Sequence, residues 1–163
     1  MHNSSGKPEM HKFQNDFSQT YEEAFKWKFG YYTNIMKRFA DCLGREKLLE
    51  LIQRAVEENN RAIATDNPEH TLVRFVEYGK EAYKNMIAYE VIEESEEVYE
   101  MKVTECLWAK IFREKNAADI GYATVCHSDF TEAEAYHPKL KLKRTKTLMQ
   151  GHDCCNHRWT WEG

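Results

Sequence analysis

The fold is decided by the stretch 87–104, whose sequence is IAYEVIEESEEVYEMKVT. Segments 87–93 and 98–104 are rich in β-branched and aromatic residues that nearly alternate with polar ones, and a polar tetrapeptide at 94–97 separates them. This pattern is typical of a β-hairpin. It predicts an antiparallel sheet in the second half of the chain.

Upstream of this hairpin the sequence is helical in character. Apolar residues recur three and four positions apart over 13–39, which predicts an amphipathic helix with an aromatic stripe. Gly44 is expected to end this helix, and a second helix is expected over 45–64. Turn residues at 65–69 precede a third helix, and Pro68 suits its first turn. The stripe indicates core packing rather than a cofactor site, and the aromatic surface is compatible with a homodimer.

Downstream, helical spacing returns over 107–113, and a further helix is expected over 117–136, before Pro138. Two strands, about 140–149 and 154–161, are expected to close the chain. The order of elements predicts an α+β fold, in which N-terminal helices pack on a small antiparallel sheet of about four strands with helices inserted between its hairpins. Residues 1–10 are expected to be a disordered lead-in to one domain over 11–163.

Composition narrows the class of protein. The chain has 163 residues and a net charge of −4, with basic residues spread along it, which argues against a nucleic-acid partner. No apolar run approaches the roughly 18 residues of a membrane span, and the N-terminus lacks the apolar region of a signal peptide. The five cysteines are therefore expected to be reduced thiols in a cytoplasmic protein. No glycine-rich nucleotide loop is present.

Candidate chemistry gathers in the last forty residues, which hold three of the five cysteines and four of the seven histidines. Alternate residues of a strand share a face, so Asp153, Cys155 and His157 would lie with the two tryptophans that follow them. Burying those tryptophans is favourable, which predicts an inward orientation for Cys155 and His157. Cys154 would then point away. A bulge near Gly151 would reverse this for Asp153 and His152.

A second group of candidates precedes that strand. Cys126 and Asp129 are three residues apart, so in a helix they share one face. A carboxylate does not activate a thiol, so Asp129 would instead orient a histidine or arginine between them. Arg144 shares the leucine face of its predicted strand, and a buried arginine needs a partner. That partner is either a substrate carboxylate or a structural Asp or Glu.

The cysteine spacing matches no closed zinc motif, because Cys154 and Cys155 are contiguous and no C-x-x-C pair exists. No metal and no cofactor are therefore expected. The alternative is a metal held by Cys126, Cys155 and one histidine that converge only in space.

Four segments carry a family resemblance: 105–109 (ECLWA), 126–129 (CHSD), 137–140 (HPKL) and 144–159 (RTKTLMQGHDCCNHRW). Together they resemble the L-2-amino-thiazoline-4-carboxylic acid hydrolase family over about residues 100–160. The helical first half agrees in layout without a specific motif. The order of elements also resembles vinyl-reductase-type ligand-binding domains.

The hydrolase resemblance implies hydrolytic opening of a cyclic amidine. Water adds to the ring carbon between nitrogen and sulfur, a thiol is released, and N-carbamoyl-L-cysteine is formed. Such a reaction needs an attacking thiolate or activated water, a proton donor for the leaving atom, and a cation for the substrate carboxylate. The implied enzyme is a hydrolase acting on a non-peptide C–N or C–S bond of a small molecule.

The resemblance implies a role for each candidate residue. The catalytic candidates are Cys126 or Cys155 as nucleophile, His152 or His157 as general base and acid, and Asp129 or Asp153 as the group that orients the histidine. Arg144 is the candidate anchor for the substrate carboxylate, and Cys106 is a further candidate substrate-binding residue.

Two other readings of the sequence remain open. The first is a sensor domain that binds a small ligand or a metal without turnover. The second is an interaction protein whose aromatic helix packs on a partner. A nucleophilic cysteine would distinguish the enzyme, because it should be a fast-reacting thiol of low pKa at Cys126 or Cys155.

Overall fold

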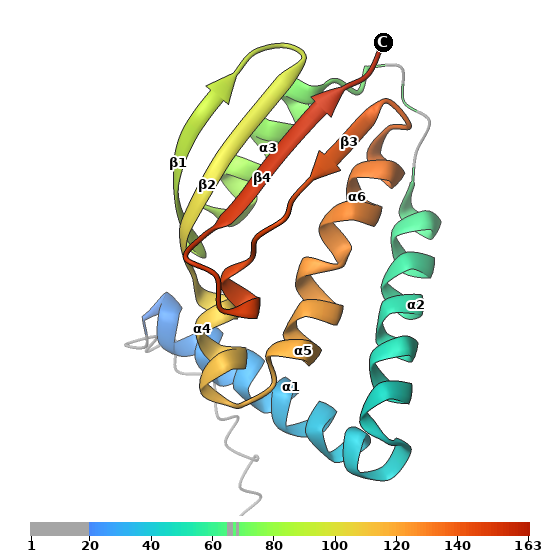
Figure 1. The fold of residues 1–163 in the computed structure, drawn as a ribbon, viewed down its shortest axis with the longest axis vertical. Coiled ribbons are helices and arrows are strands. Elements are labelled where there is room, and N and C mark those ends of the chain that lie inside the picture. Colours follow the sequence, from blue (N-terminus) through green and yellow to red (C-terminus); the bar gives the residue numbers. More distant parts are fainter. Residues whose placement is uncertain (1–19, 65–66, 68) are drawn as a thin grey trace, which may run out of the picture.

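The computed structural model describes residues 20–64, 67 and 69–163 (Figure 1). Within these residues the chain has an α+β fold, in which three helices precede a four-stranded antiparallel sheet and further helices. The fold class expected from the sequence is confirmed. The predicted lead-in at 1–10 and the first residues of the aromatic stripe lie outside the described residues.

The first two helices meet at a glycine. Helix α1 (Tyr21–Leu43) begins with a capping box, in which Oγ1 of Thr20 accepts a hydrogen bond from the backbone of Glu23 at 3.3 Å and Oε2 of Glu23 accepts one from the backbone of Thr20 at 2.8 Å. Gly44 adopts a φ of 84°, a conformation that side chains rarely tolerate, and α2 (Arg45–Ile63) follows directly. The predicted stop at Gly44 is confirmed.

A third helix, α3 (Leu72–Tyr83), begins at the N-cap Thr71 and precedes the sheet. Oγ1 of Thr71 accepts a hydrogen bond from the backbone of Arg74 at 3.2 Å. Pro68, which the sequence placed in the first helical turn, lies outside the described residues.

The predicted hairpin forms one side of the sheet. It consists of β1 (Ile87–Glu94) and β2 (Val98–Cys106), and the remaining strands are β3 (Leu140–Lys143) and β4 (Cys155–Trp161). The strand order is β1-β2-β4-β3, and all neighbours are antiparallel. In Figure 1, α3 lies behind the sheet and α6 runs beside β3.

The sheet is two-sided in its chemistry because side chains alternate along each strand. The pairs that face inward across β2 and β4 are Tyr99–Trp159, Met101–His157 and Val103–Cys155. On the other face Glu100 lies opposite Arg158, whose guanidinium binds the carboxylates of Glu93 and Glu100. The orientation predicted for Cys155 and His157 is the one observed.

Helices fill the connection between β2 and β3. They are α4 (Leu107–Glu114), α5 (Ala118–Gly121), the π-helical segment η1 (Tyr122–Cys126) and α6 (Ser128–Tyr136). The sequence predicted one helix over 117–136, whereas a wide turn interrupts it, in which the backbone N–H of His127 donates to the carbonyl of Tyr122 at 2.8 Å. Such π-helical turns are frequent at functional sites.

The predicted strand over 140–149 is too long, because β3 ends at Lys143. Oδ1 of Asn156 accepts hydrogen bonds from the backbones of Thr145 and Lys146 at 3.0 and 2.6 Å, so a side chain takes the place of the next strand pairing. The chain then forms the short 3₁₀ helix η2 (Leu148–Gln150). Local side-chain bonds of this kind compete with regular secondary structure.

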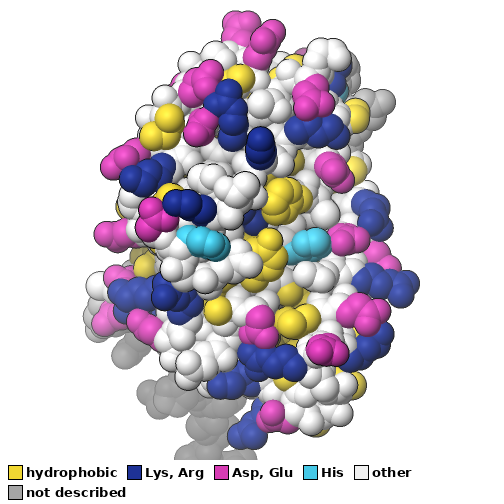
Figure 2. Space-filling model, viewed as in Figure 1, with side chains coloured by type: hydrophobic (Ala, Val, Ile, Leu, Met, Phe, Trp, Pro, Cys, Tyr) yellow, Lys and Arg dark blue, Asp and Glu magenta, His cyan; other side chains and the backbone are white. Residues whose placement is uncertain are grey.

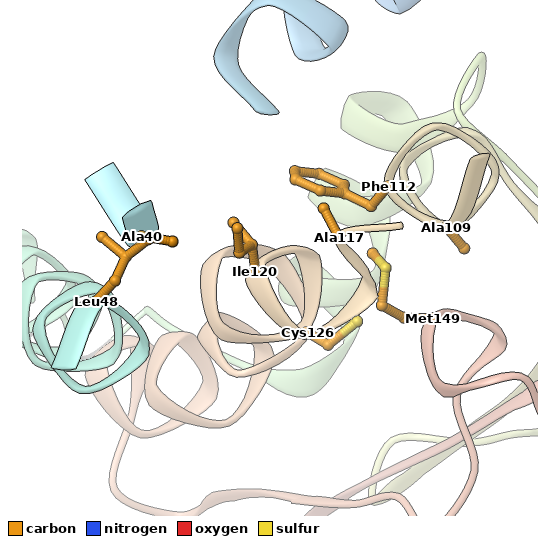
Figure 3. Close-up of a cluster of buried hydrophobic side chains, with 8 residues drawn as sticks. All are labelled: Ala40, Leu48, Ala109, Phe112, Ala117, Ile120, Cys126 and Met149. Atoms are coloured by element: carbon orange, nitrogen blue, oxygen red, sulfur yellow. The ribbon is translucent and has the colours of Figure 1, made fainter. Parts of the chain in front are cut away.

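The main hydrophobic core joins the N-terminal helices to the inserted ones (Figure 3). Phe112 and Ile120 have no exposed surface, and Met149 is 1% exposed. Gly121 lies against this cluster, since a Cβ there would come within 2.6 Å of both Met149 Sδ and Phe112 Cγ. The close approach of η2 to α5 therefore depends on a residue without a side chain.

Gly121→Ala should destabilise the protein by about 1–3 kcal/mol, the usual cost of overpacking a core. Gly79→Ala is the matched control, since the nearest atom to its Cβ is 4.0 Å away and alanine favours a helix. Urea unfolding measures both. A Gly121→Ala variant as stable as Gly79→Ala would contradict this view of the α5–η2 contact.

The surface carries both signs of charge. Figure 2 shows lysine and arginine side chains interspersed with aspartate and glutamate over the face it presents, which agrees with the even spread of charge in the sequence. Among the described residues, no helix combines the length and the apolar composition that a membrane span requires.

Candidate functional site

A cavity of about 380 Å³ lies between α3, the inner face of the sheet and the η1–α6 segment. Aromatic rings form much of its wall, including Tyr83 of α3, Tyr99 of β2, Trp108 of α4 and Trp159 of β4. The volume and the predominantly apolar lining are those of a site for a small organic molecule.

One ion pair is embedded in this apolar wall. The guanidinium of Arg144 binds Oδ2 of Asp129, and the Arg144 side chain is only 2% exposed. Nη1 of Arg144 also lies 3.1 Å from Nε2 of His157, and Nη2 donates to the carbonyl of Cys126 at 2.7 Å. The cluster thus joins the end of β3 to α6, β4 and η1. The sequence predicted either a substrate carboxylate or a structural Asp or Glu as the partner of Arg144, and within the structure that partner is Asp129.

The two ring nitrogens of His157 differ in their surroundings: Nε2 lies beside polar side chains, and Nδ1 has no hydrogen-bond partner among the described residues. Its side chain is 9% exposed, and Nε2 lies 3.5 Å from Oδ2 of Asp129 as well as next to Arg144. Nδ1 is buried without a hydrogen-bond partner among the described residues. The Tyr99 hydroxyl and Nε1 of Trp159, from side chains of the same wall, share this condition. Buried polar atoms without partners are rare and call for an explanation.

Three thiols line the cavity, those of Cys106, Cys126 and Cys155, and all three cysteines are free. Burial raises the pKa of each thiol, and raises that of Cys155 to about 11. The negative charge of Asp129 adds to the increase in the pKa of Cys126. None of the three thiols therefore has the lowered pKa that is expected of a nucleophilic cysteine.

Glu132 is a site residue that the sequence reasoning missed. It lines the cavity one helical turn after Asp129, and burial, followed by the charge of Asp129, raises the pKa of its carboxyl to about 7. A carboxyl that titrates near neutral pH is suited to acid–base chemistry or to binding a cation. The available signal was the three-residue spacing from Asp129, which places both carboxyls on one helix face.

The raised pKa of Glu132 should be visible in stability. In the unfolded chain the pKa of this carboxyl is near its ordinary value of 4.5, while in the folded protein it is about 7. The free energy of unfolding should therefore fall as pH rises through this window, by about 1–3 kcal/mol relative to Glu132→Gln. Denaturant unfolding between pH 4 and 8 measures the difference. Glu134→Gln, an exposed neighbour on α6, should leave the pH dependence unchanged.

Thiol reactivity should follow from burial as well. At pH 7.5 alkylation of Cys155 should be at least about a hundredfold slower than that of a free cysteine, whose pKa is about 8.5. The rate should then rise about tenfold per pH unit up to the thiol pKa. Mass spectrometry of iodoacetamide-treated protein measures each site. Rapid modification of Cys155 at neutral pH would show that its thiol is activated after all.

The structure brings together most of the predicted site residues. Those that line the cavity are Cys106, Cys126, Asp129, Arg144, Cys155 and His157. His152 and Asp153 do not join them. Both are exposed, and both bind groups outside the cavity. Nδ1 of His152 lies 3.1 Å from the carbonyl oxygen of Thr147, and the carboxylate of Asp153 binds Nζ of Lys146 at 3.0 Å.

The reason for this departure is the start of β4. The strand begins at Cys155, so strand alternation does not reach Asp153, and Gly151 turns the chain with a φ of 90°. Cys154 is buried but does not line the cavity. Among the described residues, no cluster of three or more His, Cys, Asp or Glu side chains is arranged to hold a metal ion.

Fold and site together define an α+β domain that encloses a small-molecule cavity with an ionic cluster in its wall. Residues 17–159 match the family described as L-2-amino-thiazoline-4-carboxylic acid hydrolase, and the chain belongs to this family. No protein of curated function matches the chain in sequence.

A solved structure shares the fold. It is the crystal structure of the phenol-responsive sensory domain of the transcription activator PoxR with phenol, which matches with a TM-score of 0.54 and 13% sequence identity. The match covers 80% of this chain and 73% of that one. At this identity the likeness concerns the fold.

Proposed function

We propose that this protein is a hydrolase that opens a small cyclic amidine, such as L-2-amino-thiazoline-4-carboxylate, to the corresponding carbamoyl thiol. The observation that carries the proposal is the Arg144–Asp129–His157 cluster in the wall of a small apolar cavity, in a chain of this hydrolase family. Buried charges are costly to maintain, and they are commonly found where a reaction uses them.

The attacking group in this proposal is water. The raised pKa values of Cys126 and Cys155 keep both thiols protonated at neutral pH, and a thiol is a far weaker nucleophile than a thiolate. Water adds to the amidine carbon between nitrogen and sulfur, and its oxygen becomes the carbonyl oxygen of the product. The bond from that carbon to sulfur breaks, and the leaving sulfur takes up one proton of the water. The second proton goes to the ring nitrogen of a neutral amidine, or to solvent when the amidine is already protonated.

His157 is the proposed acid–base group. Nε2 lies near both an Arg144 N–H and Oδ2 of Asp129. With the ring proton on Nε2 and facing Asp129, the unpartnered Nδ1 can accept a proton from water and return it to the leaving sulfur. Asp129 stabilises the imidazolium formed between these steps and fixes the orientation of the ring.

Arg144 is the proposed anchor for a substrate carboxylate. Its Nη1 donates to Asp129 and its Nη2 to the Cys126 carbonyl, while its Nε–H makes no hydrogen bond within the described part of the chain. A substrate carboxylate at this N–H would also approach the second Nη2 hydrogen, the geometry of a bidentate pair. The expectation of a carboxylate-bearing substrate therefore remains part of the proposal.

Paired variants test the assignment. His157→Gln should lower kcat/KM for L-2-amino-thiazoline-4-carboxylate at least about a hundredfold, the usual contribution of a general acid–base group. His152→Gln, an exposed histidine from the same region, should stay within about twofold. Formation of N-carbamoyl-L-cysteine is followed by mass spectrometry. Equal losses in the two variants, or no product from the unaltered protein, would rule out the proposal.

The second candidate is a ligand-binding domain without turnover. The observation in its favour is the aromatic cavity with protonated thiols, in a fold shared with a sensory domain that was crystallised with phenol. Saturable binding of small ring compounds without product formation would support this function over hydrolysis.

A further inference from the structure

Among the described residues, Glu132 is the only acidic or basic side chain of the cavity wall without an oppositely charged partner. Asp129 binds Arg144, and Nζ of Lys80 binds Oε1 of Glu94 at 2.7 Å. The Glu132 carboxyl makes no ion pair or hydrogen bond with any described side chain. Both cations of the wall are therefore already paired with other carboxylates, and Glu132 is left without a partner.

The position of Glu132 makes ionisation of its carboxyl unfavourable. It lies on the cavity face of α6 beside Asp129, whose charge opposes ionisation of a second carboxylate. On α3, which also lines the cavity, the ring of Tyr83 stands edge-on to Trp108, with 6.0 Å between the ring centres. The pKa of Tyr83 is raised by burial and then by the negative charge of Glu132. An ionised Glu132 is thus poorly compensated until a cation enters.

A second, independent feature of the cavity points to a bound molecule. The 9%-exposed side chain of His157 has Nδ1 without a partner among the described residues, and the Tyr99 hydroxyl on the neighbouring strand is in the same condition. Both belong to the sheet wall, whereas Glu132 belongs to the helix wall. The cavity therefore offers a polar ligand hydrogen-bonding groups from two sides.

We propose that Glu132 is the specificity-determining residue of the cavity and binds a planar organic cation of the amidinium class through both carboxylate oxygens. A carboxylate matches two parallel N–H donors in a bidentate pair. The surrounding aromatic rings favour a flat, delocalised cation, which gains from their π-faces and is weakly hydrated. A metal ion fits less well, because no cluster of three candidate ligands occurs in the described part of the chain.

The inference rests on the proposed function for the choice of a ring amidine as substrate. In its protonated form, such a ring presents a ring N–H and an exocyclic N–H on one edge. Glu132 would bind that edge and hold the positive charge on the amidine, which keeps its central carbon electrophilic for attack by water. A neutral ring of the same size would leave Glu132 without a partner and would bind more weakly.

Calorimetric titration with benzamidinium and benzamide tests this directly, because the two probes share size and planarity and differ in charge. At pH 8 the unaltered protein should bind benzamidinium at least tenfold more tightly than benzamide. Glu132→Gln should weaken benzamidinium binding at least tenfold and leave benzamide binding within about twofold. Glu134→Gln, the exposed neighbour, should change neither.

Retained benzamide binding shows that the Glu132→Gln variant is folded. The inference is overturned if the unaltered protein does not prefer benzamidinium, or if Glu132→Gln and Glu134→Gln bind it equally. These outcomes are separate from those of the hydrolysis assay. Glu132-dependent binding of the cation without hydrolysis would sink the proposed function alone, and hydrolysis without Glu132-dependent binding would sink this inference alone.

Discussion

The structure depends on one buried guanidinium. Arg144 ties four segments together, since from the end of β3 its guanidinium binds Asp129 on α6 and the Cys126 carbonyl in η1 and lies next to His157 on β4. Loss of one partner in such a buried pair costs about 3–5 kcal/mol, because the remaining charge is left without compensation. Phe130 lies under the guanidinium with its ring centre 4.9 Å from Cζ, which completes the enclosure of the charge. The same contact that closes the fold therefore creates the polar part of the cavity.

The rest of the cavity follows from a sheet with one polar and one inward face. Alternation along β2 and β4 turns Tyr99 and Trp159 inward, where their rings lie 6.0 Å apart, and His157 stacks on Trp159 at 5.0 Å. Helix α3 and the η1–α6 segment cover this face and leave space for a small molecule. The π-helical turn of η1 lies in this cover and ends at Cys126, three residues before Asp129.

Burial sets the chemistry of the site. In an apolar wall the neutral forms of thiols and carboxyls are favoured, which raises the pKa of Cys126, Cys155 and Glu132. A cation in the cavity would reverse the cost for Glu132, since an opposite charge stabilises a carboxylate. A site with protonated thiols and an uncompensated carboxyl is thus better suited to a charged substrate and to water as nucleophile than to thiolate attack.

By itself, the sequence determined the features that depend on short-range periodicity. Apolar spacing located helices α1 to α4, alternation located the β1–β2 hairpin, and the tryptophans of β4 predicted that Cys155 and His157 face inward. The tertiary structure decided what long-range contacts control: the partner of Arg144, the exclusion of His152 and Asp153, and the place of Glu132 in the cavity. The reason is physical, because strand and helix periods are local properties of the chain. Charge pairing and burial instead depend on which distant segments pack together, and only the folded chain brings them into contact.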